Sequence, residues 1–165
     1  MSTSPQDSEK PDEAVAKVRT VRGLPYPYPE SGAASHAVRA NRKSNTRPEK
    51  RLRALLHRNG YRFRKDLTIQ VPGLRVRPDI VFTRQRIAVF IDGCFWHRCP
   101  EHGSTPRANS AYWGPKLDRN VERDRLVDER LREAGWLVVR IWEHVSPEEA
   151  SGLVAAIVSK ARKSN

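Results

Sequence analysis

The chain has 165 residues, enough for one domain with a sizeable hydrophobic core but too few for two full domains. Lys and Arg outnumber Asp and Glu by 31 to 19, so the net charge is +12, and this excess favours a polyanionic partner such as nucleic acid. Because no apolar run approaches the roughly 20 residues that span a bilayer, and the N-terminus lacks the apolar segment of a signal peptide, we expect a cytoplasmic protein with no membrane partner.

Residues 1–35 contain many Pro, Ser, Glu and Lys residues and show no apolar periodicity, so they cannot offset the entropy cost of ordering. We expect a disordered N-terminal extension over residues 1–35 and one folded domain over residues 36–165. Residues 1–45 carry 7 basic and 5 acidic residues, which leaves 24 of the 31 basic and 14 of the 19 acidic residues in the remainder. The positive charge therefore belongs mainly to the folded part.

The first predicted element of the folded part is a helix that opens at Thr46. Thr46 and Glu49 form a capping-box pattern with a proline between them, and Asn59-Gly60 is a typical helix end. Apolar patterns bounded by turn residues then predict strands at residues 61–63, 67–71, 79–83 and 87–92. The last of these reads IAVFID, the composition of a strand buried on both faces.

Residues 93–115 are predicted to be irregular and are rich in Cys, His, Gly, Pro and aromatic residues, so we expect a site rather than a core there. Helical spacing of apolar residues predicts a helix over residues 117–134, followed by a central strand over 136–142. A second capping-box pattern opens the final helix at Ser146. This order of elements predicts an α/β fold in which helices flank a mixed central sheet.

Three acidic residues stand where elements begin or end. Glu49 lies in the first turn of the first helix, Asp79 at the entrance of a strand and Asp92 at the end of the next strand. Taken alone, Asp79 after a proline is also typical of a turn. A second carboxylate at the end of a buried strand is costly without a purpose. Because Mg²⁺ prefers carboxylates, waters and phosphate oxygens, this pattern favours a magnesium site for phosphodiester hydrolysis.

Two thiols and two imidazoles lie within nine residues of the segment Gly93–His102. Tetrahedral Zn²⁺ takes four sulfur or nitrogen ligands, and Cys94, Cys99 and His102 supply three at suitable spacing. We expect His144 as the fourth ligand, because it follows a strand and would fix the irregular loop onto the sheet. The alternative is that the cysteines are buried apolar residues without a metal.

Large aromatic residues adjoin this loop. Phe95 and Trp96 lie inside it and Trp113 follows it. In a basic domain such rings can wedge between base pairs, where unstacking costs a few kcal/mol per step and permits local distortion of the duplex. The alternative, that they fill the hydrophobic core, stays open from sequence.

Several separated motifs resemble those of the very-short-patch-repair (Vsr) endonucleases. They are Arg77-Pro78-Asp79, GCFWHRCPEHG from Gly93, Tyr112-Trp113, KLDRNVERDR from Lys116, and the segment from Gly135-Trp136 to Ile141-Trp142-Glu143. The resemblance implies a restriction-endonuclease-like core and a nick 5′ of the mismatched T in a T:G pair, the lesion left by deamination of 5-methylcytosine. It also implies a monomer that acts on double-stranded nucleoid DNA, with mismatch-repair proteins as candidate partners.

The same resemblance implies roles for individual residues. Asp79 would bind the catalytic Mg²⁺ with help from the main-chain carbonyl of Ile91. His97 would act near the attacking water, and Glu49 would order metal-bound water. The aromatic residues Phe95, Trp96 and Trp113 would intercalate beside the mismatch. Contacts with DNA phosphates are expected from Lys116, Arg119 and Arg123.

Two positions depart from the family pattern. The best-known members have a histidine where this chain has Asp92, so we expect Asp92 to be part of the catalytic site and to contact either the metal or His97. The usual cysteine after Trp-Glu is His144 here, a change that preserves a tetrahedral zinc ligand.

Two other functions stay open from the sequence. One is a restriction or defence nuclease of the same fold that cuts other DNA. The other is a non-catalytic, zinc-bearing DNA-binding module in which Asp79 and Asp92 are structural. The joint presence of Glu49, Asp79 and His97 argues against the second.

Overall fold

The structure is a computed structural model that describes residues 19–21, 24–26, 46–104, 107 and 109–163. Most of the segment that was predicted to be disordered lies outside these residues. Its described part is an antiparallel pair of short strands, β1 (Arg19–Val21) and β2 (Leu24–Tyr26). Within the described ranges, no helix has the length and apolar character needed to cross a membrane.

Helix α2 (Arg47–Arg58) confirms the prediction from the capping box. The main-chain N–H and the hydroxyl of Thr46 both donate to Glu49 Oε1, at 3.2 and 2.9 Å. At the other end the N–H of Asn59 donates to the carbonyl of Leu55, and Gly60 follows with a φ of +83°, a conformation that glycine adopts without strain. Local sequence therefore sets both ends of this helix.

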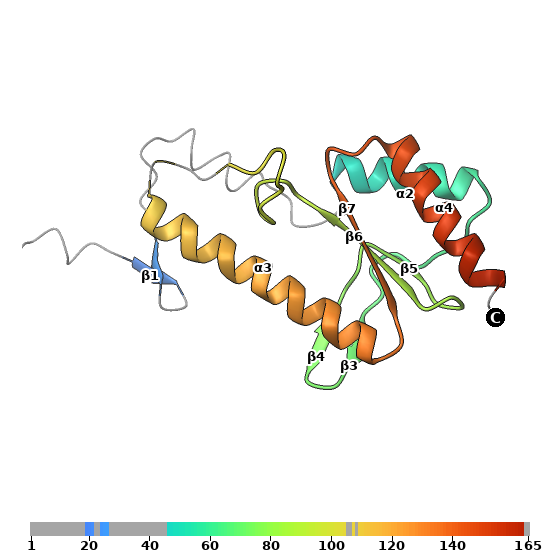
Figure 1. Ribbon diagram of the computed structural model, residues 1–165, viewed down its shortest axis with the longest axis horizontal. Helices are drawn as coiled ribbons and strands as arrows, with labels where there is room; N and C mark the ends of the chain where they lie inside the picture. Colours follow the sequence, from blue (N-terminus) through green and yellow to red (C-terminus); the bar gives the residue numbers. More distant parts are fainter. Residues whose placement is uncertain (1–18, 22–23, 27–45, 105–106, 108, 164–165) are drawn as a thin grey trace, which may run out of the picture.

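The central sheet has the strand order β5 (Ile80–Phe82), β6 (Ile87–Asp92) and β7 (Leu137–Trp142). β5 pairs with β6 antiparallel, and β6 pairs with β7 parallel, so the sheet is mixed as predicted. Figure 1 shows α2 and α4 (Pro147–Lys163) side by side at one face of this sheet and the long helix α3 (Ser110–Glu133) at the other.

Each face of the sheet has its own hydrophobic cluster because successive side chains of a strand point to opposite faces. Ile87 and Val89 of β6 pack with Leu56 of α2 and Val154 of α4. Ala88, between them in sequence, packs in the cluster that includes Leu131 of α3. β6 is therefore buried on both faces, as its near-continuous apolar sequence predicted.

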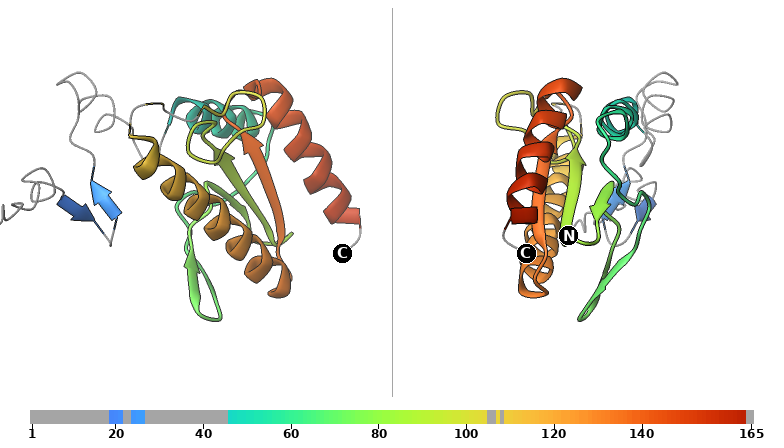
Figure 2. Two further views of the ribbon diagram at one scale, coloured as in Figure 1. Left: turned by 60° about the vertical axis from the view of Figure 1, so that its left-hand side comes forward. Right: turned by 90° about the vertical axis from the view of Figure 1, so that its right-hand side faces the viewer.

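The segment between α2 and β5 differs from the prediction. Residues 61–63 are not a strand: the rings of Tyr61 and Phe63 pack edge-on against Phe82, with ring centroids 6.4 and 5.9 Å away. Aromatic packing against the sheet thus replaces strand pairing there. Sequence analysis also missed β4 (Leu74–Val76), which pairs with β3 (Ile69–Val71) in a hairpin that lies beside α3 in Figure 2.

Helix α3 starts earlier than predicted, at Ser110 rather than at residue 117, and contains Pro115. The prediction rested on the helical spacing of apolar residues, which begins at Leu117, and a proline removes one N–H from a helix. The N–H groups of Tyr112 and Trp113 nevertheless donate to the carbonyl of Asn109, and the ring of Tyr112 is buried. Tertiary packing of this first turn therefore outweighs the local cost of the proline.

Candidate functional site

The ends of three strands meet at one edge of the sheet. Because β5 runs antiparallel to β6, Asp79 at its start lies beside the end of β6, where Asp92 stands. Because β7 runs parallel to β6, Glu143 and His144 follow at the same edge. Figure 2 shows the loop after β6 at this edge as well. The topology thus gathers the predicted acids and metal ligands at one end of the molecule.

Asp79 is a partly buried carboxyl beside other acids. The main-chain N–H of Ile91 donates to Asp79 Oδ2 at 2.7 Å. Burial raises the pKa of Asp79 to about 6, against the lowering effect of the Ile91 hydrogen bond, and the nearby charge of Glu49 raises it further. The structure therefore brings Asp79, Ile91 and Glu49 together. A bound cation would relieve the cost of ionising this carboxyl.

Glu49 is 4% exposed, unusually low for a carboxylate. The capping box fixes its Oε1, and Arg53, one turn along the same helix, donates to its Oε2 at 3.2 Å. Glu49 is thus both the cap of α2 and an acid of the candidate site.

Asp92 is 5% exposed and faces α3 rather than α2, because it alternates with Ile91 along β6. Both of its carboxylate oxygens accept from one Arg140 nitrogen, at 2.8 and 3.0 Å, and its Oδ1 lies 3.7 Å from His97 Nδ1. Burial raises the pKa of Asp92, and Arg140 opposes that effect. Of the two contacts expected for Asp92, the described residues provide the one with His97.

His97 lies in the loop after β6, where its N–H donates to the carbonyl of Gly93. Its ring Nδ1 is hydrogen-bonded to Asp124 Oδ2 of α3. Although burial raises the pKa of Asp124, the hydrogen bond and charge of His97 hold it below its usual range. The imidazole is therefore fixed at Nδ1, which leaves Nε2 for chemistry.

The four predicted zinc ligands converge. One possible ligand atom from each of Cys94, Cys99, His102 and His144 lies within 4.8 Å of the others. His144 Nδ1 lies 3.1 Å from Cys94 Sγ and 3.7 Å from Cys99 Sγ. Tetrahedral bonds of about 2.0–2.3 Å place ligand atoms about 3.3–3.8 Å apart, so small side-chain shifts would let this donor set hold one metal ion.

The loop after β6, which carries Cys94, is also held by Glu143. The sequence analysis did not assign a role to Glu143. The N–H of Cys94 donates to Glu143 Oε1 at 2.7 Å, and the N–H of Glu143 donates to the carbonyl of Asp92 at 2.9 Å. Burial raises the pKa of the Cys94 thiol to about 11, and neighbouring Cys99 and Glu143 add to this effect. Binding of a cation at this cluster would thus release protons.

The three aromatic residues form one half-buried cluster. Ring centroids of Phe95 and Trp96 are 5.0 Å apart, and Trp113 lies 5.5 Å from the first and 5.9 Å from the second. Lys116 Nζ lies over the rings of Trp96 and Trp113, at 5.6 and 5.1 Å, and donates to the hydroxyl of Tyr112. Lys116 is therefore part of this cluster, in addition to its predicted role on DNA.

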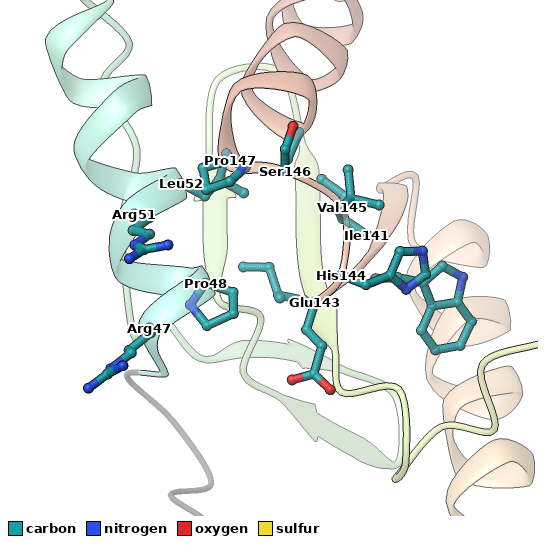
Figure 3. Close-up of a pocket in the computed structure, with 13 residues that line it drawn as sticks. Arg47, Pro48, Arg51, Leu52, Ile141, Glu143, His144, Val145, Ser146 and Pro147 are labelled. Atoms are coloured by element: carbon teal, nitrogen blue, oxygen red, sulfur yellow. The ribbon is translucent and has the colours of Figure 1, made fainter. Parts of the chain in front are cut away.

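Exposed arginines surround the site. Arg119 and Arg123 lie on the solvent side of α3, one turn apart. A cleft of about 240 Å³ opens between the starts of α2 and α4 and the end of β7. Figure 3 shows Arg47 and Arg51 of α2 on one side of it and Glu143 on the other. Sequence reasoning missed this pair of arginines.

Asp124 and Arg140 were also missed, although a signal was present. Asp124 and Asp128 are four residues apart in a predicted helix, so they share one helix face. A lone arginine in the apolar strand LVVRIW needs a buried partner of opposite charge. Their pairing required knowledge of which face of the strand meets α3.

Comparisons with known proteins show which proteins the chain is similar to. The sequence model of the family described as DNA mismatch endonuclease Vsr matches residues 28–101. The type II nicking enzyme V.NaeI of Lentzea aerocolonigenes is 51% identical over 152 residues, which cover 92% of this chain and 90% of that protein. The type II nicking enzyme V.XorIIP of Xanthomonas oryzae pv. oryzae is 45% identical, over 62% of this chain and 73% of that protein. The DNA mismatch endonuclease Vsr of Escherichia coli strain K12 is 38% identical, over 69% of this chain and 71% of that protein.

The raised pKa of Asp79 predicts a pH-dependent stability effect. Between pH 3.8 and about 6 the carboxyl ionises in the unfolded chain but not in the folded protein, so stability falls as pH rises through this window. Asp79→Asn keeps an oxygen for the Ile91 N–H and removes the ionisation. In magnesium-free buffer we expect it to stabilise the protein by about 2–3 kcal/mol at pH 8 and hardly at pH 4, as measured by urea unfolding. Equal changes at both pH values would contradict this assignment.

Proposed function

The chain belongs to the Vsr family of DNA mismatch endonucleases, and from this membership we propose that it nicks one strand of duplex DNA on the 5′ side of the mismatched T in a T:G pair. The observation that carries the proposal is the partly buried Asp79 carboxyl, held beside Glu49 where the strand ends meet. Acids at adjoining strand ends of a mixed sheet also support a restriction-endonuclease-like core. A cytoplasmic monomer acting on nucleoid DNA, with mismatch-repair proteins as partners, completes the proposal.

Magnesium is the cofactor that these acids would hold. Asp79 and the main-chain carbonyl of Ile91 would be its protein ligands, and Glu49 would orient water near them. The ion would polarise the scissile phosphate and stabilise the leaving oxygen. The fit rests on the carboxyl of Asp79, whose ionisation is costly without a neighbouring cation.

His97 is the residue that would take a proton from the attacking water. With Nδ1–H donated to Asp124, the ring presents Nε2 as the acceptor. The Asp124 carboxylate would then stabilise the imidazolium that forms. Asp92, which accepts a hydrogen bond from Arg140, also lies close to the His97 ring.

Zinc is the metal that fits the second cluster. Two thiolates and two imidazoles are a common donor set for structural Zn²⁺, and all four positions are filled by protein. Its ligands come from the loop after β6 and from the end of β7. The ion would therefore fix the loop that carries His97 and the aromatic residues.

Recognition of the mismatch would combine two kinds of contact. The cluster of Phe95, Trp96 and Trp113 would wedge into the base stack, which a wobble pair resists less than a Watson–Crick pair. Lys116, Arg119 and Arg123 would contact phosphates, together with the two arginines of the cleft.

A second candidate is a nuclease of the same family that acts at a defined sequence without a mismatch, as part of restriction or defence. The relatives named type II nicking enzymes motivate it. It predicts strand cleavage of a fully paired duplex, which the first experiment below tests.

Nicking should depend on the mismatch, on Mg²⁺ and on Asp79. We expect end-labelled duplexes to be cut 5′ of T in T:G, and C:G and 5-methyl-C:G duplexes of the same sequence to stay intact; U:G tests the need for the thymine methyl group. Asp79→Ala should abolish nicking and keep mismatch binding, because it removes a metal ligand but few DNA contacts. Glu129→Ala, an exposed acid on α3, is the matched control and should nick normally. Cleavage of the C:G duplex would favour the second candidate.

The purified protein should contain one Zn²⁺ per chain. We expect Cys94→Ala to lose the metal, because a three-ligand site that opens to solvent binds more weakly, and His144→Cys to keep it, because thiolate replaces imidazole. Metal analysis by mass spectrometry measures both, and His57→Ala is the control for loss of an exposed histidine outside the cluster. A full equivalent of zinc in Cys94→Ala would exclude this ligand set.

A salt titration of DNA binding should distinguish the aromatic residues that wedge into the base stack from the residues that contact phosphates. Trp96→Ala and Trp113→Ala should lose discrimination between T:G and C:G duplexes and keep the salt dependence of binding. Arg119→Ala and Arg123→Ala should weaken both duplexes alike and lower the log–log salt slope by about one unit each. If both tryptophan variants keep wild-type preference for T:G, the rings serve the core and other residues recognise the lesion.

A further inference from the structure

Arg140 is a largely buried cation in contact with three carboxylates. Its side chain is 22% exposed. One terminal nitrogen donates to both oxygens of Asp92, the Nε donates to Asp128 Oδ1 at 3.0 Å, and the second terminal nitrogen lies 3.5 Å from Asp124 Oδ1. That second nitrogen also donates to the main-chain carbonyl of Asp124 at 3.4 Å. All five N–H donors of a guanidinium point in one plane, so a single side chain can hold three acids in fixed relation.

The position of Arg140 follows from strand and helix periodicity. In the parallel register Arg140 stands beside Phe90, and its guanidinium lies 4.8 Å from the centre of that ring. Asp124 and Asp128 are one turn apart on the face of α3 that meets β7. Two like charges at this spacing repel each other unless a cation stands between them. Arg140 is that cation.

Other cations near these acids are much more exposed. Arg123 lies 3.8 Å from Asp124 with 63% of its side chain exposed, and Arg132 lies 3.4 Å from Asp128 with 61% exposed. The side chains of Asp92, Asp124 and Asp128 are 7, 16 and 14% exposed. Solvent screens the outer arginines, so among the arginines near these acids Arg140 compensates most of the buried charge, and His97 adds to this at Asp124.

We propose that Arg140 is a positioning residue that acts on His97 through Asp124 and Asp92. Asp124 uses one carboxylate oxygen for His97 Nδ1 and presents the other to Arg140. Asp92, which Arg140 also holds, places its Oδ1 3.7 Å from the same Nδ1 of His97. Arg140 thereby fixes the plane and the tautomer of the ring. This inference rests on the proposed function for the role of His97, but the hydrogen-bond geometry can be tested without it.

Asp92 has a defined place in this arrangement. Both of its carboxylate oxygens are hydrogen-bonded to Arg140, on the face of the sheet that meets α3. It therefore contributes to the surroundings of His97 both through the arginine and through its own contact with the ring nitrogen.

The first experiment compares Arg140→Lys with Arg132→Lys in single-turnover nicking of a T:G duplex. Lysine keeps the charge but cannot hold three acids in one plane. We expect Arg140→Lys to slow the nicking step by about 10- to 100-fold, the size of effect that misplacement of a catalytic group produces, with the Kd for the duplex unchanged within twofold. Arg132→Lys, at an exposed partner of Asp128, should keep the wild-type rate. A wild-type rate in Arg140→Lys would overturn the proposal.

A double-mutant cycle tests whether the effect passes through His97. If Arg140 acts by positioning this ring, Arg140→Lys should slow nicking in the wild-type background and have no further effect in His97→Ala. An equal slowing in both backgrounds would overturn the proposal, because it would show that Arg140 acts independently of the histidine. Should Arg140→Lys fail to fold, Arg140→Gln/Asp92→Asn takes its place, since it removes the charge of Arg140 together with the charge of one acid that Arg140 holds. We expect this double variant to fold and to nick as slowly as Arg140→Lys.

A spectroscopic measurement separates this inference from the proposed function. The Nδ1 proton that His97 shares with Asp124 should give a downfield resonance in protein with ¹⁵N-labelled histidine, assigned by its loss in His97→Ala. We expect the resonance in the wild type and in Arg132→Lys, and its loss or broadening in Arg140→Lys. An unchanged resonance in Arg140→Lys would overturn the positioning role. If the wild-type protein nicks no mismatched duplex, the proposed function fails, and the resonance alone decides the role of Arg140.

Discussion

β6 and β7 run parallel through six paired residues, from Ile87 with Leu137 to Asp92 with Trp142. Parallel neighbours need a long crossover connection, and here residues 93–136 supply it as a loop followed by α3. This pairing brings the acid at the end of β6 and His144, the candidate metal ligand after β7, to one edge. It also sets Arg140 on the face that meets α3. The candidate nuclease site, the metal cluster and the charge network all depend on this single register.

The loop after β6 loses conformational entropy when it is ordered, so favourable contacts are needed to hold it in place. Two kinds of contact hold it. Glu143, after β7, accepts from the N–H of Cys94, and the four-residue Cys/His cluster joins the loop to His144. The aromatic cluster joins Phe95 and Trp96, near the start of the loop, to Trp113 in the first turn of α3. His97 lies between these two anchors, so each anchor contributes to where its ring stands.

Local patterns in the sequence predicted the parts of the structure that depend on neighbouring residues. The capping box at Thr46, the doubly buried strand of β6 and the spacing of Cys94, Cys99 and His102 all need only nearby positions, and the structure agrees with each. The predicted start of α3 was wrong because the apolar spacing begins at Leu117, whereas the helix begins at Ser110 with the buried Tyr112 in its first turn. The pairs of His97 with Asp124 and of Asp92 with Arg140 join residues 27 and 48 positions apart. Such pairs depend on how α3 faces the sheet, which periodicity alone does not give.

Glu49 closes the N-terminus of α2 and stands among the acids around Asp79. Its consequence is evolutionary. A mutation at this position changes helix stability and the electrostatics of the site at the same moment, so selection cannot adjust one property without the other. Thr46 and Glu49 therefore have to change together or not at all, because the hydrogen bonds of the cap join the two residues.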